Sequence, residues 1–257
     1  MIELDIDLPQ GALLNGCAAE LSAAITACGG TWLHGDEASL RLADDGETLI
    51  GWRSMDGLRE ALPIKPNEGH GRRALTETGQ GLRCVSGENC GFHLAELTEQ
   101  VETFSMAVFF HADPQAEPRT LLTLNGEGRG RGSSYLFLSD NADGLVVKDT
   151  GQCLSLEVPG SSGAAGLRVL VVTVSGDRVA LQEGFGEIHS ARGTRPDLPT
   201  PASLFIGARS HRGGLQKTLG ASVIEDVMFW PGVSLLMPRN ARDEGHQARL
   251  ERFALWR

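Results

Sequence analysis

The sequence lacks a long apolar run, a basic leader and an excess of positive charge. None of its apolar stretches approaches the ~20 residues that a membrane-spanning helix needs, so we expect no membrane insertion. Residues 1–10 lack the basic start and apolar core of a secretory signal, which predicts synthesis in the cytoplasm. With 23 Lys and Arg against 33 Asp and Glu, the net charge is −10. A surface this acidic repels phosphate backbones, so we expect no nucleic-acid partner.

Cysteine patterns typical of metal sites are also missing. The five cysteines include no C-x-x-C pair and no zinc-type spacing. An odd number of cysteines without a secretory signal favours reduced thiols that are mostly buried. Cys84 and Cys90 flank the segment VSGEN and could pair across a turn, the alternative being two small core residues.

Catalytic motifs are equally scarce. The sequence has no G-x-S-x-G nucleophile turn and no Glu-x-Asp-x-x-Glu carboxylate pattern, and its Gly-rich segment 126–134 lacks the GK[ST] of a phosphate loop. The seven histidines are scattered, and Glu183 and Glu187 bracket a turn-like GFG. We therefore predict that the protein is not an enzyme.

What the sequence does contain is glycine and many short strand-like segments. Glycine numbers 33 among 257 residues, about twice the usual share. Apolar or alternating segments are divided by turn residues roughly every 8–12 residues, which predicts an antiparallel β-sandwich or barrel. No helical pattern alternates with these segments, so a parallel α/β sheet is not expected.

Three blocks follow one another along the chain. Residues 1–51 are interpreted as an N-terminal attachment segment with a strand and a short helix, and residues 52–236 hold most of the strand-like segments. Residues 237–257 predict a C-terminal helix that docks on the fold or makes a subunit contact. Its apolar residues near one helical face are Leu250, Phe253, Ala254 and Trp256.

The middle block carries, in order, several features of a known family. These features are Trp52, Asp56-Gly57, Gly81-Leu82, FSMAVFF at 104–110, SLFIGAR at 203–209 and GASVIEDVMFWPGVSLL at 220–236. Over about residues 75–236 the chain thereby resembles the laminin-G-like or concanavalin-A-like jelly roll. The resemblance implies an all-β, antiparallel jelly-roll sandwich of the lectin or glucanase type, here with short helical appendages at both ends.

Two positions depart from the pattern of that family. Leu167-Arg168 stands where the family has a Trp-His, and Glu183-Gly184 stands where it has an Asp-Gly. These departures fall beside the long strand pair that the sequence predicts between residues 167 and 184.

Two basic segments stand out on this acidic protein, one at 126–134 and one at 208–214. Guanidinium groups hold a carboxylate or sulfate of a sugar through paired hydrogen bonds. The candidate ligand-binding residues are Arg129, Arg131, Tyr135, Arg209, His211 and Arg212. The alternatives are a polar loop or a contact with a neighbouring subunit.

The segment SDNADG at 139–144 is a candidate calcium site. Asp140, Asn141 and Asp143 offer the oxygen ligands that calcium prefers, and the resemblance implies calcium at the rim of the sandwich. The alternative is a plain turn, since Asn, Asp and Gly are turn residues in any case.

Together these features predict a non-catalytic recognition module that binds a polysaccharide or cell-surface glycan. We expect it to work in a homo- or hetero-oligomeric assembly, such as a phage-like particle released from the cell that made it. A plain cytosolic protein fits the lack of a secretory signal equally well. Two alternatives stay open: a purely structural virion, tail or decoration component without glycan binding, and a jelly-roll glycoside hydrolase.

Overall fold

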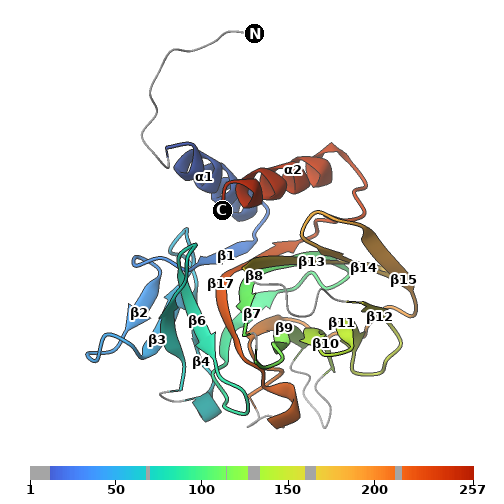
Figure 1. The fold of residues 1–257 in the computed structure, drawn as a ribbon. Coiled ribbons are helices and arrows are strands. Elements are labelled where there is room, and N and C mark those ends of the chain that lie inside the picture. The colour runs from blue at the N-terminus through green and yellow to red at the C-terminus, as the bar shows by residue number, and fades with distance from the viewer. Residues whose placement is uncertain (1–11, 68–69, 114, 127–133, 160–165, 212–215) are drawn as a thin grey trace.

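The computed structural model of the protein describes residues 12–67, 70–113, 115–126, 134–159, 166–211 and 216–257. Two antiparallel sheets face each other, and two helices lie together outside one of them (Figure 1). The predicted all-β fold, an antiparallel sandwich with short helical appendages, is confirmed. None of the helices described is long and apolar enough to cross a membrane.

The first sheet has eight strands. They are β1 (Thr31–His34), β5 (Arg72–Leu75), β6 (Gln80–Cys84), β8 (Thr103–Ala112), β13 (Leu167–Ser175), β14 (Arg178–Glu183), β15 (Ile188–Arg192) and β17 (Ser222–Pro231). Their order is β15-β14-β13-β8-β17-β6-β5, and β1 pairs with the second half of β17. One edge of β17 is therefore shared by β6 and β1, while β8 lies along the other edge.

The second sheet has nine strands. They are β2 (Leu40–Leu42), β3 (Leu49–Arg53), β4 (Glu60–Pro63), β7 (Phe92–Thr98), β9 (Arg119–Gly126), β10 (Ser134–Asn141), β11 (Gly144–Asp149), β12 (Ser155–Val158) and β16 (Ala202–Ile206). Their order is β12-β11-β10-β9-β16-β7-β4-β3-β2. Two single turns of 3-10 helix, η1 (Lys65–Asn67) and η2 (Gln216–Thr218), lie in the connections.

The first sheet is covered on both faces. In β8, Met106, Val108 and Phe110 point into the core between the sheets, whereas Ala107 and Phe109 point to the helices. This follows from the alternation of side chains along a strand. The closing strand β17 is buried over nearly its whole length, as its apolar residues on both faces predicted.

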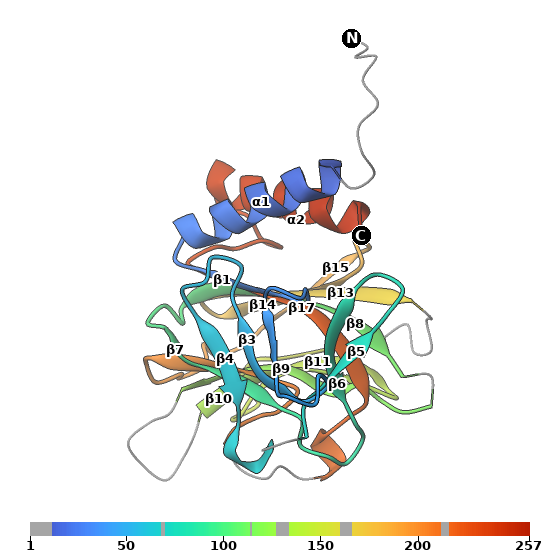
Figure 2. The same ribbon diagram turned by 90° about the vertical axis from the view of Figure 1, so that its left-hand side faces the viewer.

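Helices α1 (Ala12–Ala27) and α2 (Ala241–Leu255) form the outer layer over the first sheet (Figure 2). The Asn240 side chain caps the start of α2 by accepting from the backbone N–H groups of residues 242 and 243. Leu250 and Phe253 are buried against the sheet, as the helical spacing predicted. Trp256, expected near the same face, lies past the end of the helix and is 53% exposed.

The N-terminal strands are part of the sandwich. The boundary predicted after residue 51 falls inside β3, and β4 joins β3 to the second sheet through β7. Because β1 is hydrogen-bonded to β17, this block is integrated into both sheets. The strand expected at the very start of the chain lies outside the described residues.

The structure contains Cys84 and Cys90 as buried free thiols, the second of the two alternatives that the sequence left open. Burial, together with the nearby Cys90, raises the pKa of Cys84 to about 12. The expectation of mostly buried thiols does not extend to the others, since Cys17 and Cys28 are half-buried and Cys153 is exposed.

Candidate functional site

The outer face of the second sheet, remote from the helices, carries a group of aromatic and cationic side chains. In β10, Leu136 and Leu138 are buried between the sheets. The alternating residues Tyr135 and Phe137 are half-buried and point to the outer face, with ring centroids 6.1 Å apart.

Arg209 reaches this face from the segment that follows β16. Gly207, with a φ of +66°, lets the chain leave the strand. The Arg209 guanidinium lies 3.7 Å from the centroid of the Phe137 ring, and its Nε donates to Thr120 Oγ1 at 3.1 Å. Burial lowers the pKa of Arg209, although contacts with Tyr135 oppose the shift. A guanidinium remains charged at neutral pH in any such setting.

Two histidines extend the group across the sheet. His93 of β7 and His211 have ring centroids 4.3 Å apart, and both rings contact Phe205 of β16. Strands β10 and β7 are separated by β9 and β16, so the group spans about 14 Å at the usual strand spacing. We call Tyr135, Phe137, Arg209, His93 and His211 the outer-face cluster.

The outer-face cluster contains three of the six ligand-binding residues that the sequence predicted, namely Tyr135, Arg209 and His211. Arg129, Arg131 and Arg212 lie outside the described residues. Sequence reasoning missed Phe137 and His93. The alternation in YLFLS was a signal for Phe137, because it places that ring on the same face as Tyr135. Nothing local pointed to His93, which joins through the pairing of β7 with β16.

The predicted calcium residues lie at the end of β10 and in the turn after it. Asp140 is 2% exposed and its Oδ2 accepts from Arg168 Nη1. Burial raises the pKa of Asp140, although Arg168 opposes the shift. Asn141 ends β10 and Asp143 is an exposed turn residue. Within the described residues, no group of three or more His, Cys, Asp or Glu side chains could hold a metal ion. With a guanidinium already on Asp140, these residues do not fit calcium.

The two departures from the family pattern meet in the structure. Arg168 Nε donates to Glu183 Oε1 at 2.8 Å, between the neighbouring strands β13 and β14. The same guanidinium pairs with Asp140 of the opposite sheet and lies 5.0 Å from the Phe110 ring. Arg168 therefore links both sheets near the rim that faces the turn after β10.

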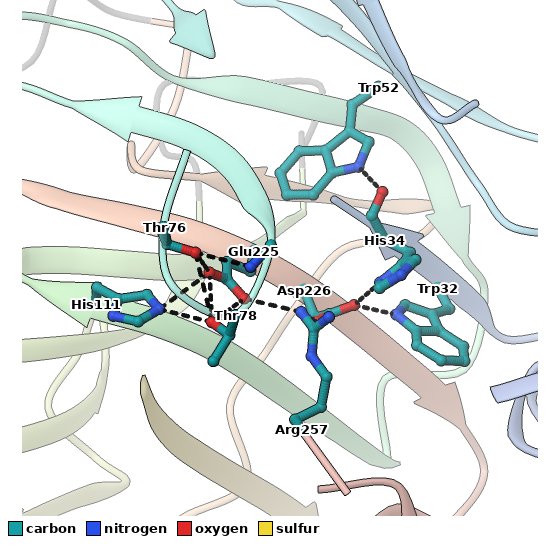
Figure 3. Close-up of polar contacts among 10 residues, drawn as sticks. Trp32, His34, Trp52, Thr76, Thr78, His111, Glu225, Asp226 and Arg257 are labelled. Carbon is teal, nitrogen blue, oxygen red and sulfur yellow. Dashed lines mark hydrogen bonds and ion pairs between the residues drawn. The ribbon is translucent and has the colours of Figure 1, made fainter. Parts of the chain in front are cut away.

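A second polar group is buried in β17, under the end of α2 (Figure 3). A β-bulge between Ile224 and Asp226 makes Glu225 an extra residue relative to β8. The bulge lies where the edge of β17 passes from β6 to β1. As a result, the adjacent carboxylates of Glu225 and Asp226 both reach the Arg257 guanidinium.

Asp226 is surrounded by donors. Trp32 Nε1 donates to Oδ1 at 2.7 Å, His34 Nδ1 lies 2.6 Å from the same oxygen, and Arg257 Nη2 donates to Oδ2 at 2.7 Å. Burial by itself would raise the pKa of Asp226, but His34 and Arg257 outweigh it and lower that pKa. Burial likewise disfavours a charged His34, yet the hydrogen bond and charge of Asp226 raise the pKa of His34.

Glu225 is equally enclosed. Thr76 and Thr78 donate to its carboxylate, His111 Nε2 lies 3.0 Å from Oε1, and Arg257 Nη2 donates to Oε2 at 2.8 Å. Both carboxylates have side chains that are 0% exposed. Through Arg257, two residues past the end of α2, this cluster joins the C-terminal segment to the sandwich. The carboxylate oxygens of Glu225 and Asp226 already accept from protein donors.

Comparisons with known proteins place the chain by fold. No protein-family model and no curated protein matches its sequence. Domain 4 of the extracellular arabinanase AbnA from Geobacillus stearothermophilus, solved in complex with arabinotriose, matches with a TM-score of 0.57 and 13% identity, over 87% of this chain and 97% of that chain. A GH54 α-L-arabinofuranosidase matches with a TM-score of 0.51 and 11% identity, over 80% and 51% of the two chains. These two structures share the sandwich fold with this protein.

Domains LG4-5 of the mouse laminin α1 chain match with a TM-score of 0.43 and 10% identity, over 60% of this chain and 41% of that chain.

Proposed function

We propose that the protein is a non-catalytic recognition module that binds a saccharide at the outer-face cluster. The observation that carries the proposal is the Arg209 guanidinium held on the Phe137 ring with Tyr135 beside it. Aromatic rings offer flat apolar surface with little conformational freedom to lose, and a guanidinium offers a planar fork of donors. Together they suit a sugar, which has apolar C–H faces and polar oxygens around its ring.

A structural neighbour supports a sugar as the class of ligand. Domain 4 of AbnA was solved in complex with arabinotriose, and its fold matches 87% of this chain. The residues in the two binding sites need not be the same for the fold to present a ligand on its surface. We expect the native ligand to be a polysaccharide or cell-surface glycan, met by the protein within a larger assembly such as a phage-like particle.

The burial of the acidic groups supports binding without hydrolysis. A glycoside hydrolase places two carboxylates roughly 5–10 Å apart on either side of the bond to be cleaved. Glu225 and Asp226 are adjacent, but both are fully buried and hydrogen-bonded to protein donors. Glu183 is paired with Arg168, and Glu187 is an exposed residue beyond the turn. Arg257 bridges the two buried carboxylates, and neither side chain is exposed to solvent.

A glycan array followed by titration calorimetry tests the proposal. We expect the full chain to retain at least one saccharide, and Tyr135→Ala to weaken its binding by about threefold to tenfold through the loss of one aromatic surface. Arg192→Ala, an exposed change in β15 of the other sheet, serves as the control and should leave affinity unchanged. Absence of binding to every saccharide would favour the structural component, and reducing ends released from a polysaccharide would favour the hydrolase.

A further inference from the structure

We infer that the saccharide bound at the outer-face cluster is anionic, and that Arg209 holds its carboxylate or sulfate group. This inference rests on the proposed function and adds the chemical class of the ligand. The charge environment of Arg209 differs from that of the other two arginines that lie over phenylalanine rings.

Three arginines of the described chain lie over phenylalanine rings. Arg168 and Arg257, at 5.0 and 5.7 Å from their ring centroids, each form ion pairs with two carboxylates. Arg209 lies closer to its ring, at 3.7 Å, and no ion pair joins it to an Asp or Glu among the residues that the structure describes. Among the described residues, its side chain contacts the Phe137 ring, the Thr120 hydroxyl and Tyr135, none of which carries a carboxylate.

An uncompensated cation at a half-buried position is unfavourable by itself. Charges removed from water are normally paired, because the lost hydration has to be replaced. Carboxylates are abundant in this protein, which has 33 acidic residues and a net charge of −10. None of the described carboxylates balances Arg209, although the chain is rich in them. This arrangement is expected of a binding site in which the ligand supplies the negative charge.

The geometry of Arg209 suits a planar or tetrahedral oxyanion. Thr120 accepts from Nε, and Asn125 Nδ2 donates to the Arg209 backbone carbonyl at 3.0 Å, so both the backbone and one edge of the guanidinium are held. The two Nη atoms carry the other four N–H donors, and beside the contact with Tyr135 they can donate to two oxygens of a carboxylate or sulfate. A group held in advance in this way loses less entropy on binding.

Matched ligands test the inference directly. The probes are an oligogalacturonate, a sulfated oligosaccharide and a neutral galacto-oligosaccharide of equal length, each titrated into the full chain. We expect at least one acidic probe to bind about tenfold or more tightly than the neutral one. Arg209→Ala should weaken acidic-probe binding by about 10- to 100-fold, since hydrogen bonds to charged groups are the strong ones, and should leave neutral-probe binding nearly unchanged.

Lys148→Ala is the matched control, because it also removes one positive charge close to the outer-face cluster. Lys148 lies on β11 opposite Phe137 of β10, and unlike Arg209 it forms an ion pair, with Glu157. We expect it to change acidic-probe affinity by no more than about twofold. Arg209→Lys keeps the charge but not the fork, and should fall between wild type and Arg209→Ala. If Arg209→Ala shows no cooperative unfolding transition and is therefore not folded, the comparison is made with Arg209→Lys instead.

The outcomes separate the two proposals. If the wild type binds neutral and acidic probes equally, or if Arg209→Ala and Lys148→Ala behave alike, the anionic ligand is wrong while saccharide recognition stands. If the wild type binds none of the probes and nothing on a glycan array, saccharide recognition itself is wrong.

Discussion

Arg257, which follows the C-terminal helix, is one of the residues that hold the helical layer on the sandwich. Its side chain is 7% exposed, and its guanidinium bridges the fully buried carboxylates of Glu225 and Asp226. Replacing a buried ion cluster with apolar residues is often tolerated, but removing one member leaves unbalanced charge on side chains that solvent does not reach. The cluster therefore makes the end of the chain a determinant of stability.

We expect Arg257→Ala to lower the free energy of unfolding by about 3–5 kcal/mol, because it strands two buried carboxylates. Equilibrium unfolding in urea measures the change. Arg252→Ala is the control: Arg252 pairs with Glu20 on the surface, with 51% of its side chain exposed, and should cost at most about 1 kcal/mol. Similar losses in the two variants would show that the buried cluster contributes no more than a surface pair.

At the scale of elements, α2 is held on the first sheet by a small number of aromatic contacts. The Phe253 ring lies 4.8 Å from the Trp32 ring and 5.6 Å from the Phe109 ring, in edge-to-face arrangements. Leu250, one turn earlier, is buried on the same face. These two residues connect the C-terminal helix to β1 and β8, which are far from it in sequence.

We expect Phe253→Ala to destabilise the protein by about 3–5 kcal/mol through lost burial and the cavity left behind. Trp256→Ala, which removes a larger ring from a position 53% exposed just after the helix, should change stability by about 0.5 kcal/mol or less. Thermal and urea unfolding of the two variants measure the difference. A Trp256 variant that unfolds as easily as the Phe253 variant would mean that the exposed ring is covered in solution, as a subunit contact requires.

At the scale of the whole molecule, stability is linked to pH through the contact of His34 with Asp226. The pKa of His34 is raised in the folded protein, so its contribution is complete below its unfolded value of about 6.5 and is lost as pH rises through the folded value. The pKa of Asp226 is lowered, so its contribution is complete above about 3.9 and is lost as pH falls through the folded value. The pair is most favourable between these limits.

We expect the free energy of unfolding to fall as pH rises above about 6.5, and the His34→Gln variant to show a smaller fall. Other titrating groups are common to both proteins, so the difference between their pH profiles reports on His34. Urea unfolding at several pH values gives the two profiles. Parallel profiles above about pH 6.5 would contradict the linkage.

Local periodicity determined the layered architecture. Alternation in β8 and β17, turn residues between short strands and the spacing of Leu250 and Phe253 all depend on neighbours within a few residues. These patterns are enough to predict two packed sheets and a docked terminal helix. A different sequence feature, the two basic segments on an acidic chain, predicted Tyr135, Arg209 and His211 as candidate ligand residues.

Only the tertiary structure decided which polar groups meet. His34 lies 192 positions from Asp226 in the sequence, and they are joined by the pairing of β1 with β17. Strand register likewise joins Arg168 to Glu183, which the sequence showed only as two separate departures from a family pattern. The packing of Arg209 on Phe137 depends on how the chain folds back after β16. Periodicity specifies which side of an element faces the core, but partners across a sheet follow from register and chain path, which short-range sequence patterns do not encode.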